Sequence, residues 1–530
     1  MRATKMTKSI SITRLLLAPV VALLLVATAH AATPGITGPT FNLTAQTAFL
    51  NQPDGAAVYA WGYGCNGAPA GFAPAAITNA TCPNMQVPGP TLIVTEGQTV
   101  TVTLTNGLPT SVGNTSILFP GFAVTTAGTG VPGLLAQEAA PGGTVTYTFT
   151  ATTPGTHPYY SGTQSDLQIE MGLYGALIVL PANVPSNCTT GLAATNQSVK
   201  GVWGEADFRL AASAYDSPLT CYDREYLFQW SEMDPSIHRA ALAQVTATQG
   251  CTAGAPGCSL QVPTEPYHPA YFLINGRSMP DLMDANYAAE YPHQPYNGNP
   301  HMHPGDLTLV RAIGQGRWQH PFHEHGNHVR ILGRDGNLVT TPDGNGLAGL
   351  LMFNTDTTPG QAFEGIFYWS GRGLNWDPYG HNPTSTDAYA KVGCTSDANG
   401  YNTQVVTLDK LHTINYYEWC GDHNKPLEVA PFGDVAAGGP ATLPDPNIFT
   451  NGPWYGGTPY LGPDATTRSA GPTSNLQPSN IQANPGNERG FAFMWHSHNE
   501  REITTNNVFP GGMLMMMLVD SREFVIDESN

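Results

Sequence analysis

The sequence predicts an all-β protein made of two β-sandwiches, the second of which carries a long irregular insertion. Short runs of alternating β-branched and polar residues, bounded by turn residues, are typical of half-buried strands. Two such runs lie at 88–106 and 142–150, and their pattern returns at 304–313 and 360–369. The chain also contains 58 Gly and 45 Pro residues, which suit short strands joined by turns. This faint repeat indicates two copies of one sandwich.

The domain boundaries follow from where this strand pattern starts and stops. The first sandwich is expected to span 32–183, and a connector, 184–223, leads to the second sandwich at 224–525. The strand pattern is interrupted at about 371–487, where Gly, Pro, Asn and Asp are frequent, so we expect an insertion there. The methionine-rich segment 512–519 is interpreted as a buried closing strand, because Met fills cores well.

Residues 1–31 have the features of a secretory signal peptide. A basic segment and an apolar run precede the small-residue cleavage site Ala29-His30-Ala31. The apolar run at 15–27 is short for a membrane span, and an uncleaved anchor is the alternative. We therefore expect a secreted or periplasmic protein with no membrane span after signal cleavage.

The charge balance limits the class of partner. Acidic residues outnumber basic ones 39 to 21, which gives a formal net charge of −18 at pH 7. A negative surface disfavours nucleic acid and anionic membranes and favours cations. The expected partners are a metal ion and a small-molecule or metal reductant, with no nucleic acid.

Eight cysteines follow the predicted signal peptide, an even number that indicates disulfides in an exported chain. Pairing sequence neighbours is the simplest of the 105 possible arrangements, and the sequence leaves the choice open. The neighbour pairs are Cys65–Cys82, Cys188–Cys221, Cys251–Cys258 and Cys394–Cys420. None of these cysteines is close in sequence to the histidine-rich segments, so thiolate ligands for a metal are not expected.

Two short segments concentrate the histidines: His320, His323, His325 and His328 in the first, and His496 and His498 in the second. Residues two apart in an extended strand share a face, so His323 and His325 point to one side and His320 to the other. By the same rule His496 and His498 share a face. Two such strands would bring four imidazoles together, which predicts a metal site. Ordinary core or surface histidines are the alternative.

The motifs His320-Pro-Phe-His-Glu-His-Gly, His496-Ser-His and Gly512-Met resemble the C-terminal copper motifs of the multicopper oxidases. The resemblance covers most of the mature chain outside the insertion. It implies two cupredoxin-like Greek-key sandwiches, as in the two-domain members of that family, and a homo-trimer. It also implies copper as the cofactor, with one group of ligands on each face of the expected strand that contains His320, His323 and His325. The first group is His323, His325, His496 and His498, and the second, for a mononuclear copper, is His320 and Met513.

The first sandwich departs from the family pattern at its ligands. In the segment that resembles the first family motif, Leu118 and Pro120 stand where histidines are usual. In the second, Tyr160 and Gly162 replace ligands, and His157 is out of register. A full three-copper cluster is therefore not expected.

The second sandwich departs at the mononuclear copper. Ser497 stands where the family has the cysteine of blue copper, and Glu502 replaces a following histidine. A serine hydroxyl is a poor substitute for a thiolate, so a strong electron-accepting copper is not expected at His320 and Met513. His301 and His303 are interpreted as a surface-loop pair that could lie near the same rim, and His328 as a residue that orients a ligand.

Four imidazoles without a thiolate suit Cu(II) best and Zn(II) next. The sequence therefore predicts an exported, multicopper oxidase-like copper-binding protein. It could be a copper-dependent oxidoreductase acting on metal ions or small reductants through the C-terminal histidines. The alternative is non-catalytic copper binding or storage, or a surface structural protein on a degenerate oxidase scaffold.

Overall fold

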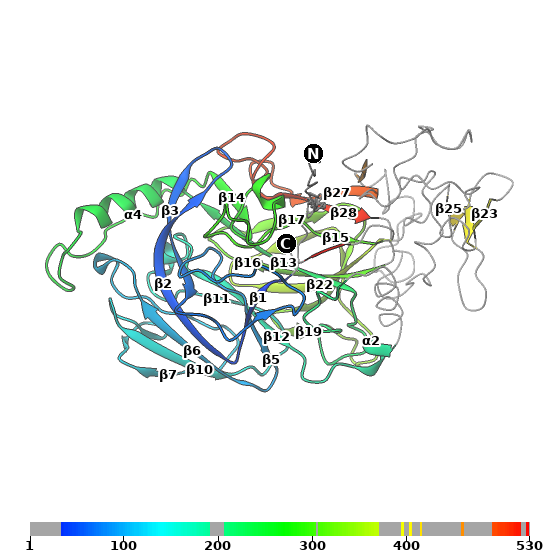
Figure 1. Cartoon of the computed structure of the whole chain (residues 1–530), viewed down its shortest axis with the longest axis horizontal. Coiled ribbons are helices and arrows are strands. Elements are labelled where there is room, and N and C mark those ends of the chain that lie inside the picture. The colour runs from blue at the N-terminus through cyan, green and yellow to red at the C-terminus, as the bar shows by residue number, and fades with distance from the viewer. Residues whose placement is uncertain are drawn as a thin grey trace, which may run out of the picture.

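The computed structural model describes residues 33–190, 206–303, 306–369, 490–520 and 526–528, with four short strands between 394 and 460. The predicted signal peptide and most of the predicted insertion lie outside these residues. Within the described part of the chain, no helix is both long and apolar enough to cross a membrane. Figure 1 shows two groups of β-sheet: β6, β7 and β10 of the first lie at the lower left, and β15, β27 and β28 of the second lie at the upper right.

The first sandwich consists of two five-stranded sheets. One has the order β11-β12-β5-β1-β4, and the other β3-β2-β6-β10-β7. The strands of the first are β11 (Gly155–Tyr160), β12 (Tyr174–Leu180), β5 (Leu92–Thr95), β1 (Gly35–Thr37) and β4 (Phe72–Ala73). Those of the second are β3 (Ala57–Cys65), β2 (Thr40–Asn51), β6 (Thr99–Asn106), β10 (Thr144–Thr150) and β7 (Thr125–Gly128). A separate hairpin pairs β8 (Val131–Pro132) with β9 (Gln137–Glu138).

The alternation predicted for these strands is observed. In β6, Val100, Val102 and Leu104 are buried while the threonines between them are more exposed. β10 pairs with β6 in antiparallel register, which sets Tyr147 opposite Val102 and Phe149 opposite Val100. Both strands therefore direct their apolar side chains into one core, as a period of two requires.

The second sandwich packs one large sheet against the sheet that carries the histidines. The large sheet has the order β14-β13-β16-β22-β18-β19, with β20 beside β18. Its strands are β14 (Tyr271–Ile274), β13 (Arg224–Met233), β16 (Leu307–Gly314), β22 (Ala362–Tyr368), β18 (Val329–Arg334), β19 (Asn337–Leu338) and β20 (Leu351–Met352). Phe322, Trp495 and the buried methionines Met515 and Met517 belong to the core of this sandwich.

The facing sheet has the order β15-β28-β27-β17-β21, and β26 pairs with the far end of β27. Its strands are β15 (His301–Met302), β28 (Leu514–Asp520), β27 (Gly490–Ser497), β17 (His320–Glu324), β21 (Asn354–Thr357) and β26 (Gly457–Tyr460). Inside the predicted insertion, β23 (Cys394–Ser396), β24 (Asn402–Gln404) and β25 (Ile414–Asn415) form a small sheet. The prediction of an all-β chain with two cupredoxin-like sandwiches is confirmed, and the methionine-rich segment is the buried closing strand β28.

The described helices are few and short: η1 (Thr110–Val112), α1 (Ser165–Gln168), α2 (Ser186–Thr190), α4 (Pro235–Ala247) and η2 (Asp281–Met283). Sequence reasoning missed α4. The Asp234 side chain accepts a hydrogen bond from Ser236 N–H, and Pro235 occupies the first turn, a standard helix start. Ile237 and Ala241 of this helix join the core of the first sandwich. α4 thus ties the start of the second sandwich to the first.

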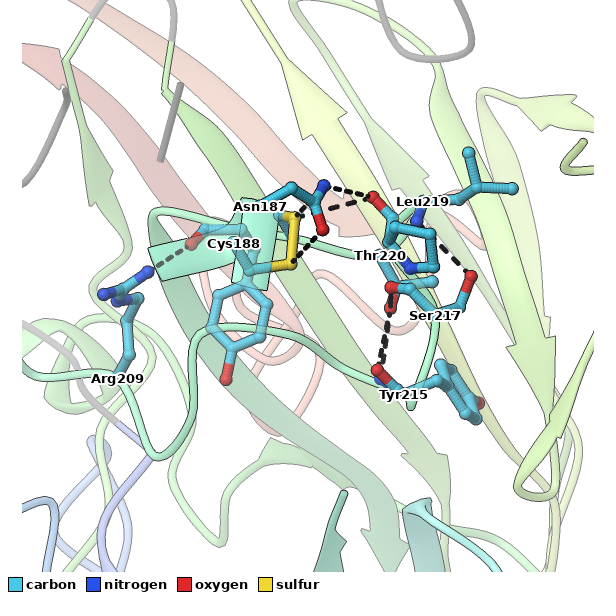
Figure 2. Close-up of a disulfide and its surroundings, with 10 residues drawn as sticks. Asn187, Cys188, Arg209, Tyr215, Ser217, Leu219 and Thr220 are labelled. Carbon is cyan, nitrogen blue, oxygen red and sulfur yellow. Dashed lines mark hydrogen bonds between the residues drawn. A yellow bond between two sulfur atoms is a disulfide. The ribbon is translucent and has the colours of Figure 1, made fainter. Parts of the chain in front are cut away.

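Three predicted disulfides are confirmed: Cys65–Cys82, Cys188–Cys221 and Cys251–Cys258. The predicted Cys394–Cys420 bond lies outside the residues whose side chains are described. Figure 2 shows Cys188 in its surroundings, where Asn187 donates a hydrogen bond of 2.9 Å to the carbonyl of Pro218. The disulfide and this bond close the connector between the two sandwiches into a loop.

A buried polar cluster joins the two sandwiches. Glu364 of β22 accepts hydrogen bonds from the Thr156 N–H of β11 and, at 2.6 Å, from the Tyr215 hydroxyl of the connector. Arg311 of β16 pairs with Glu225 at 2.8 Å and donates to the Thr156 hydroxyl at 3.2 Å. All five side chains are almost fully buried. The buried charge of Glu364 therefore depends on donors from the first sandwich and the connector, while Arg311 is paired within its own sandwich and also reaches Thr156 of the first.

We predict that Glu364→Ala lowers the free energy of unfolding by about 2–5 kcal/mol. The substitution leaves two buried donors without an acceptor, and each such loss costs about 1–3 kcal/mol. Arg311 loses its longer contact with Glu364, at 3.8 Å, but keeps Glu225 at 2.8 Å, so most of the cost comes from these donors. Asp356→Ala on the exposed edge of β21 is the control, with an expected change of about 0.5 kcal/mol or less. Equal effects of the two variants in denaturant unfolding would contradict this account of the interface.

Candidate metal centre

The register between β17 and β27 builds the centre of the site. These antiparallel strands set His323 directly opposite His496, with Phe322 opposite Ser497 and Glu324 opposite Trp495. Residues opposite each other on paired strands share a face of the sheet. His323 and His496 therefore lie on the outer face, while Phe322 and Trp495 pack into the core. The predicted alternation is observed.

His325 and His498 extend the same face beyond the strands. The backbone N–H of His325 donates to Met494 O at 3.1 Å, and that of His498 donates to Pro321 O at 2.8 Å. The His323 ring centroid lies 4.7 Å from that of His325, 5.4 Å from that of His496 and 4.9 Å from that of His498. We call these four residues the histidine quartet. The structure brings together all four imidazoles that the sequence predicts for one site.

Backbone carbonyl groups fix how two of these rings present their nitrogens. His323 Nδ1 is hydrogen-bonded to the carbonyl of Phe353, and His496 Nδ1 lies 2.7 Å from the carbonyl of Ser497. A carbonyl only accepts, so each Nδ1 carries the proton when the ring is neutral. The lone pair is then on Nε2. His496 Nε2 lies 3.2 Å from His325 Nε2, so both atoms face the centre of the quartet.

Two members of the quartet, His323 and His496, are poised in the neutral form that binds metals. The pKa of His323 is lowered to about 4, chiefly by burial, and the nearby His325, His496 and His498 contribute to this decrease. Burial is also the main cause that lowers the pKa of His496. The site remains reachable, since His323 and His325 are only half-buried and His498 is exposed. Neutral imidazole is the form that ligates metal ions.

His320 lies on the opposite face, as predicted, but its nitrogens contact carboxylates. Nε2 lies 2.9 Å from Glu232 Oε2, and Nδ1 lies 2.9 Å from Glu502 Oε2. Ser497 Oγ donates to the same Glu502. Burial acts against the cation, yet hydrogen bonds with both glutamates raise the pKa of His320 to about 9. These contacts argue against the predicted ligand role of His320.

Met513 is also separate from the quartet. Its backbone N–H donates to Glu502 O at 2.8 Å, and its carbonyl accepts from Ser497 N–H. Its fully buried side chain belongs to the core of the second sandwich. We call His320 and its carboxylate partners Glu232 and Glu502 the pocket of His320. The backbone of Met513 lies beside this pocket, and the role of its side chain as a copper ligand stays a prediction.

The other histidines singled out by sequence fall into two groups. His328 lies near the quartet, with its ring centroid 5.5 Å from that of Phe353, whose carbonyl holds His323. Burial lowers its pKa to about 4. His301 and His303 are not surface residues: both are fully buried on or next to β15, and His301 Nδ1 lies 2.6 Å from Asp520 Oδ2. Their expected exposure is wrong, because β15 pairs with β28 and is covered.

The first sandwich brings its two altered motifs together as an apolar site. Leu118 and Tyr160 are paired by reciprocal backbone hydrogen bonds. Leu118 also packs so closely over Gly162 that a Cβ there would lie 2.8 Å from Leu118 Cγ. A groove of about 590 Å³ is lined by Leu118, Pro120 and Tyr160 among others. His157 is buried, and its Nε2 is hydrogen-bonded to Thr153 O. These side chains offer no set of metal ligands.

Part of this chain is similar to proteins of a known family. Residues 72–184 match the family model described as multicopper oxidase. Multicopper oxidase MCE of Talaromyces pinophilus is 36% identical over 126 residues, which are 22% of this chain and 20% of that protein. Residues 72–184 are a multicopper oxidase domain. The resemblance seen in the sequence is confirmed.

Further relatives of the multicopper oxidase domain are similar over equally short stretches. Copper resistance protein A of Escherichia coli is 38% identical over 96 residues, 18% of this chain and 15% of that protein. The chain thus spans a fifth or less of the length of these curated relatives. A solved blue copper oxidase from Nitrosomonas europaea superposes with a TM-score of 0.43 at 16% identity, covering 91% of this chain and 85% of that chain.

The multicopper oxidase family implies copper as the cofactor, and the quartet fits such an ion. One ligand atom from each of His323, His325 and His496 lies within 4.8 Å of the others. Two nitrogens about 2.0 Å from a metal, at a tetrahedral angle, lie about 3.3 Å apart. The 3.2 Å between His325 Nε2 and His496 Nε2 matches this spacing. The donor set, imidazoles without a thiolate, suits Cu(II).

Sequence reasoning missed two residues that shape these sites. Phe353, 30 residues from His323, provides the carbonyl that orients it, and any residue type could do so. Glu232, 88 residues before His320, comes from the opposite sheet. No local pattern marks either residue. The signal for Glu232 is its charge in the buried strand β13, where an ionised side chain needs a buried partner.

We predict that the protein keeps most of its copper between pH 7 and about 5.5 and loses it as the pH approaches 4. Protons compete with a metal for the imidazole lone pair, and ordinary histidine protonates near pH 6.5. The lowered pKa of His323, about 4, shifts that competition to lower pH. Equilibrium dialysis followed by metal analysis measures the retained copper. A loss centred near pH 6.5 would show that the quartet is not held in the neutral form.

Proposed function

We propose that this chain is an exported copper protein that binds copper at the histidine quartet and oxidises metal ions or small reductants there. The observation that supports this most is the convergence of four imidazoles on one half-exposed face, two of them oriented by backbone carbonyls. The quartet lies outside the residues that match the family model, so its role rests on this geometry. Export rests on the signal-like sequence of residues 1–31.

Access to the quartet favours direct contact with a reductant. His498 is exposed, and the neighbouring Phe353 is 51% exposed. Leu350 nearby in sequence is 54% exposed. A small aromatic or metal-ion reductant can therefore reach the imidazole edges from solvent. Bound copper would supply the one-electron chemistry, while these side chains hold the ion and admit the reductant.

A second candidate function is copper binding or storage without turnover. The specific observation in its favour is the pocket of His320, where the family has an electron-accepting copper. Glutamates engage both nitrogens of His320 there, and Ser497 replaces a thiolate. Without that acceptor, electrons have no second metal through which to reach the quartet. A copper that cycles slowly or not at all would then serve as a store.

The test measures copper per chain and oxygen consumption on the exported protein, with ferrous ion and a phenol as reductants. We expect about one copper per chain and oxygen uptake that requires it. His323→Ala or His496→Ala should weaken copper binding by more than the 10–100-fold that loss of an outer hydrogen-bond partner costs. His268→Ala, an exposed histidine outside the quartet, is the matched control and should retain copper.

The two candidate functions give different results. The oxidoreductase function is supported if His323→Ala removes the copper and the copper-loaded protein takes up oxygen faster than the apoprotein. Copper binding that His323→Ala removes, without oxygen uptake above that of the apoprotein, supports copper storage. Copper that stays bound after both quartet substitutions would contradict both candidates.

A further inference from the structure

We propose that the place of the family's second copper holds instead a permanent imidazolium, His320, fixed between Glu232 and Glu502. Of the two metal sites that the sequence predicts on β17, the one at His320 would then hold no copper. This inference is independent of the proposed function, because it concerns a pocket on the other face of β17. It follows from the hydrogen bonds that each member of the pocket makes.

Glu232 is held as an ionised carboxylate by its donors. Its Oε1 accepts from the backbone N–H groups of Arg317 at 2.8 Å and Trp318 at 2.9 Å, and lies 3.1 Å from the Tyr267 hydroxyl. Its Oε2 is left for His320 Nε2. A carboxylate that accepts several hydrogen bonds is stabilised in the charged form. Glu232 is therefore an acceptor toward His320.

Glu502 is held in the same state from the other side. Its Oε2 accepts from Ser497 Oγ at 2.5 Å, and its Oε1 accepts from Asn499 Nδ2 at 2.9 Å. The remaining contact of Oε2 is His320 Nδ1. Ser497 and Glu502 stand where the family has copper ligands, and here they bind each other. Two residues that depart from the pattern have thus become one hydrogen-bonded pair.

The ring between these carboxylates must donate from both nitrogens. A neutral imidazole has one N–H, so one of its two carboxylate contacts would set a lone pair against a negative charge. An imidazolium has two N–H groups and satisfies both contacts. His320 is fully buried, and each of its nitrogens lies 2.9 Å from its carboxylate. A metal ligated by His320 would have to displace a proton and break one of these ion pairs.

His320 is the cationic group in direct contact with Glu232 and Glu502, while the Arg317 guanidinium lies 4.1 Å from the centre of the Tyr267 ring and His238 lies 3.5 Å from Glu170. The Tyr267 hydroxyl that meets Glu232 also contacts Glu170 Oε2 at 2.6 Å, so a third carboxylate lies one hydrogen bond away. Burial and these two glutamates raise the pKa of Tyr267, which keeps its hydroxyl a donor. The Arg317 guanidinium turns outward to the exposed Glu265, at 2.7 Å. A positive charge at His320 offsets the carboxylates that face it.

The imidazolium also gives the fold a pH dependence with a defined sign. The folded pKa of His320 is raised to about 9 from an unfolded value of about 6.5. Its contribution to stability is therefore complete below pH 6.5 and is lost as the pH rises through about 9. The same three side chains join β17, β13 and the turn after β27, so they brace the strand that carries His323.

The test is a nitrogen NMR spectrum of the apoprotein labelled in its histidines, at pH 7.5. His320 is assigned by its absence from the spectrum of His320→Gln. We expect two ring N–H signals from His320 in wild type. Glu502→Gln, which can accept or donate at this position, should lower the His320 pKa by at least one unit, a tenfold change in proton affinity. Glu265→Gln, at a residue that is 71% exposed, is the matched control and should leave both signals unchanged.

Anaerobic addition of excess Cu(I), which is diamagnetic, completes the test. We expect the two His320 N–H signals to remain, whatever happens to the signals of the quartet. A single N–H on His320 in wild-type apoprotein would overturn the proposal, as would loss of its N–H signals on addition of copper. The wild-type spectrum decides the question even if Glu502→Gln does not fold. Copper binding at the quartet is not required for either result.

Discussion

The antiparallel register of β17 and β27 is the constraint on which both polar sites depend. It sets His323 opposite His496 and Phe322 opposite Ser497. A shift of one residue would exchange the faces of a strand, so it would turn Phe322 and Trp495 out of the core. Their aromatic packing, with ring centroids 5.9 Å apart, therefore holds the register. The position of the imidazoles is a consequence of apolar burial elsewhere in the same strands.

The two faces of β17 place histidines in opposite electrostatic environments. On the outer face, partial burial and repulsion from neighbouring histidines keep His323 neutral, which leaves its lone pair for a cation from outside. On the inner face, complete burial would also favour neutral His320, but Glu232 and Glu502 outweigh it. One strand thus presents histidines as ligands on one side and as a fixed charge on the other. The groups that surround a histidine, not the residue type, decide whether it is a neutral ligand or a fixed positive charge.

The sequence predicts the quartet because its geometry is local. Alternation along a strand places His323 with His325 and His496 with His498, and the family motifs indicate which strands meet. The partners of His320 could not be predicted, because Glu232 lies 88 residues away on the opposite sheet. The buried His301 was misjudged for the same reason, since its cover comes from the distant β28. α4 could have been found from Asp234 and Pro235, which form an ordinary helix start.

The most direct test of the account is anomalous diffraction at the copper edge from crystals grown with excess copper. We predict one strong anomalous peak within bonding distance of the quartet nitrogens His323 Nε2, His325 Nε2 and His496 Nε2. We also predict no peak among His320, Glu232 and Glu502. A peak at His320, or an empty quartet beside copper bound elsewhere, would contradict it.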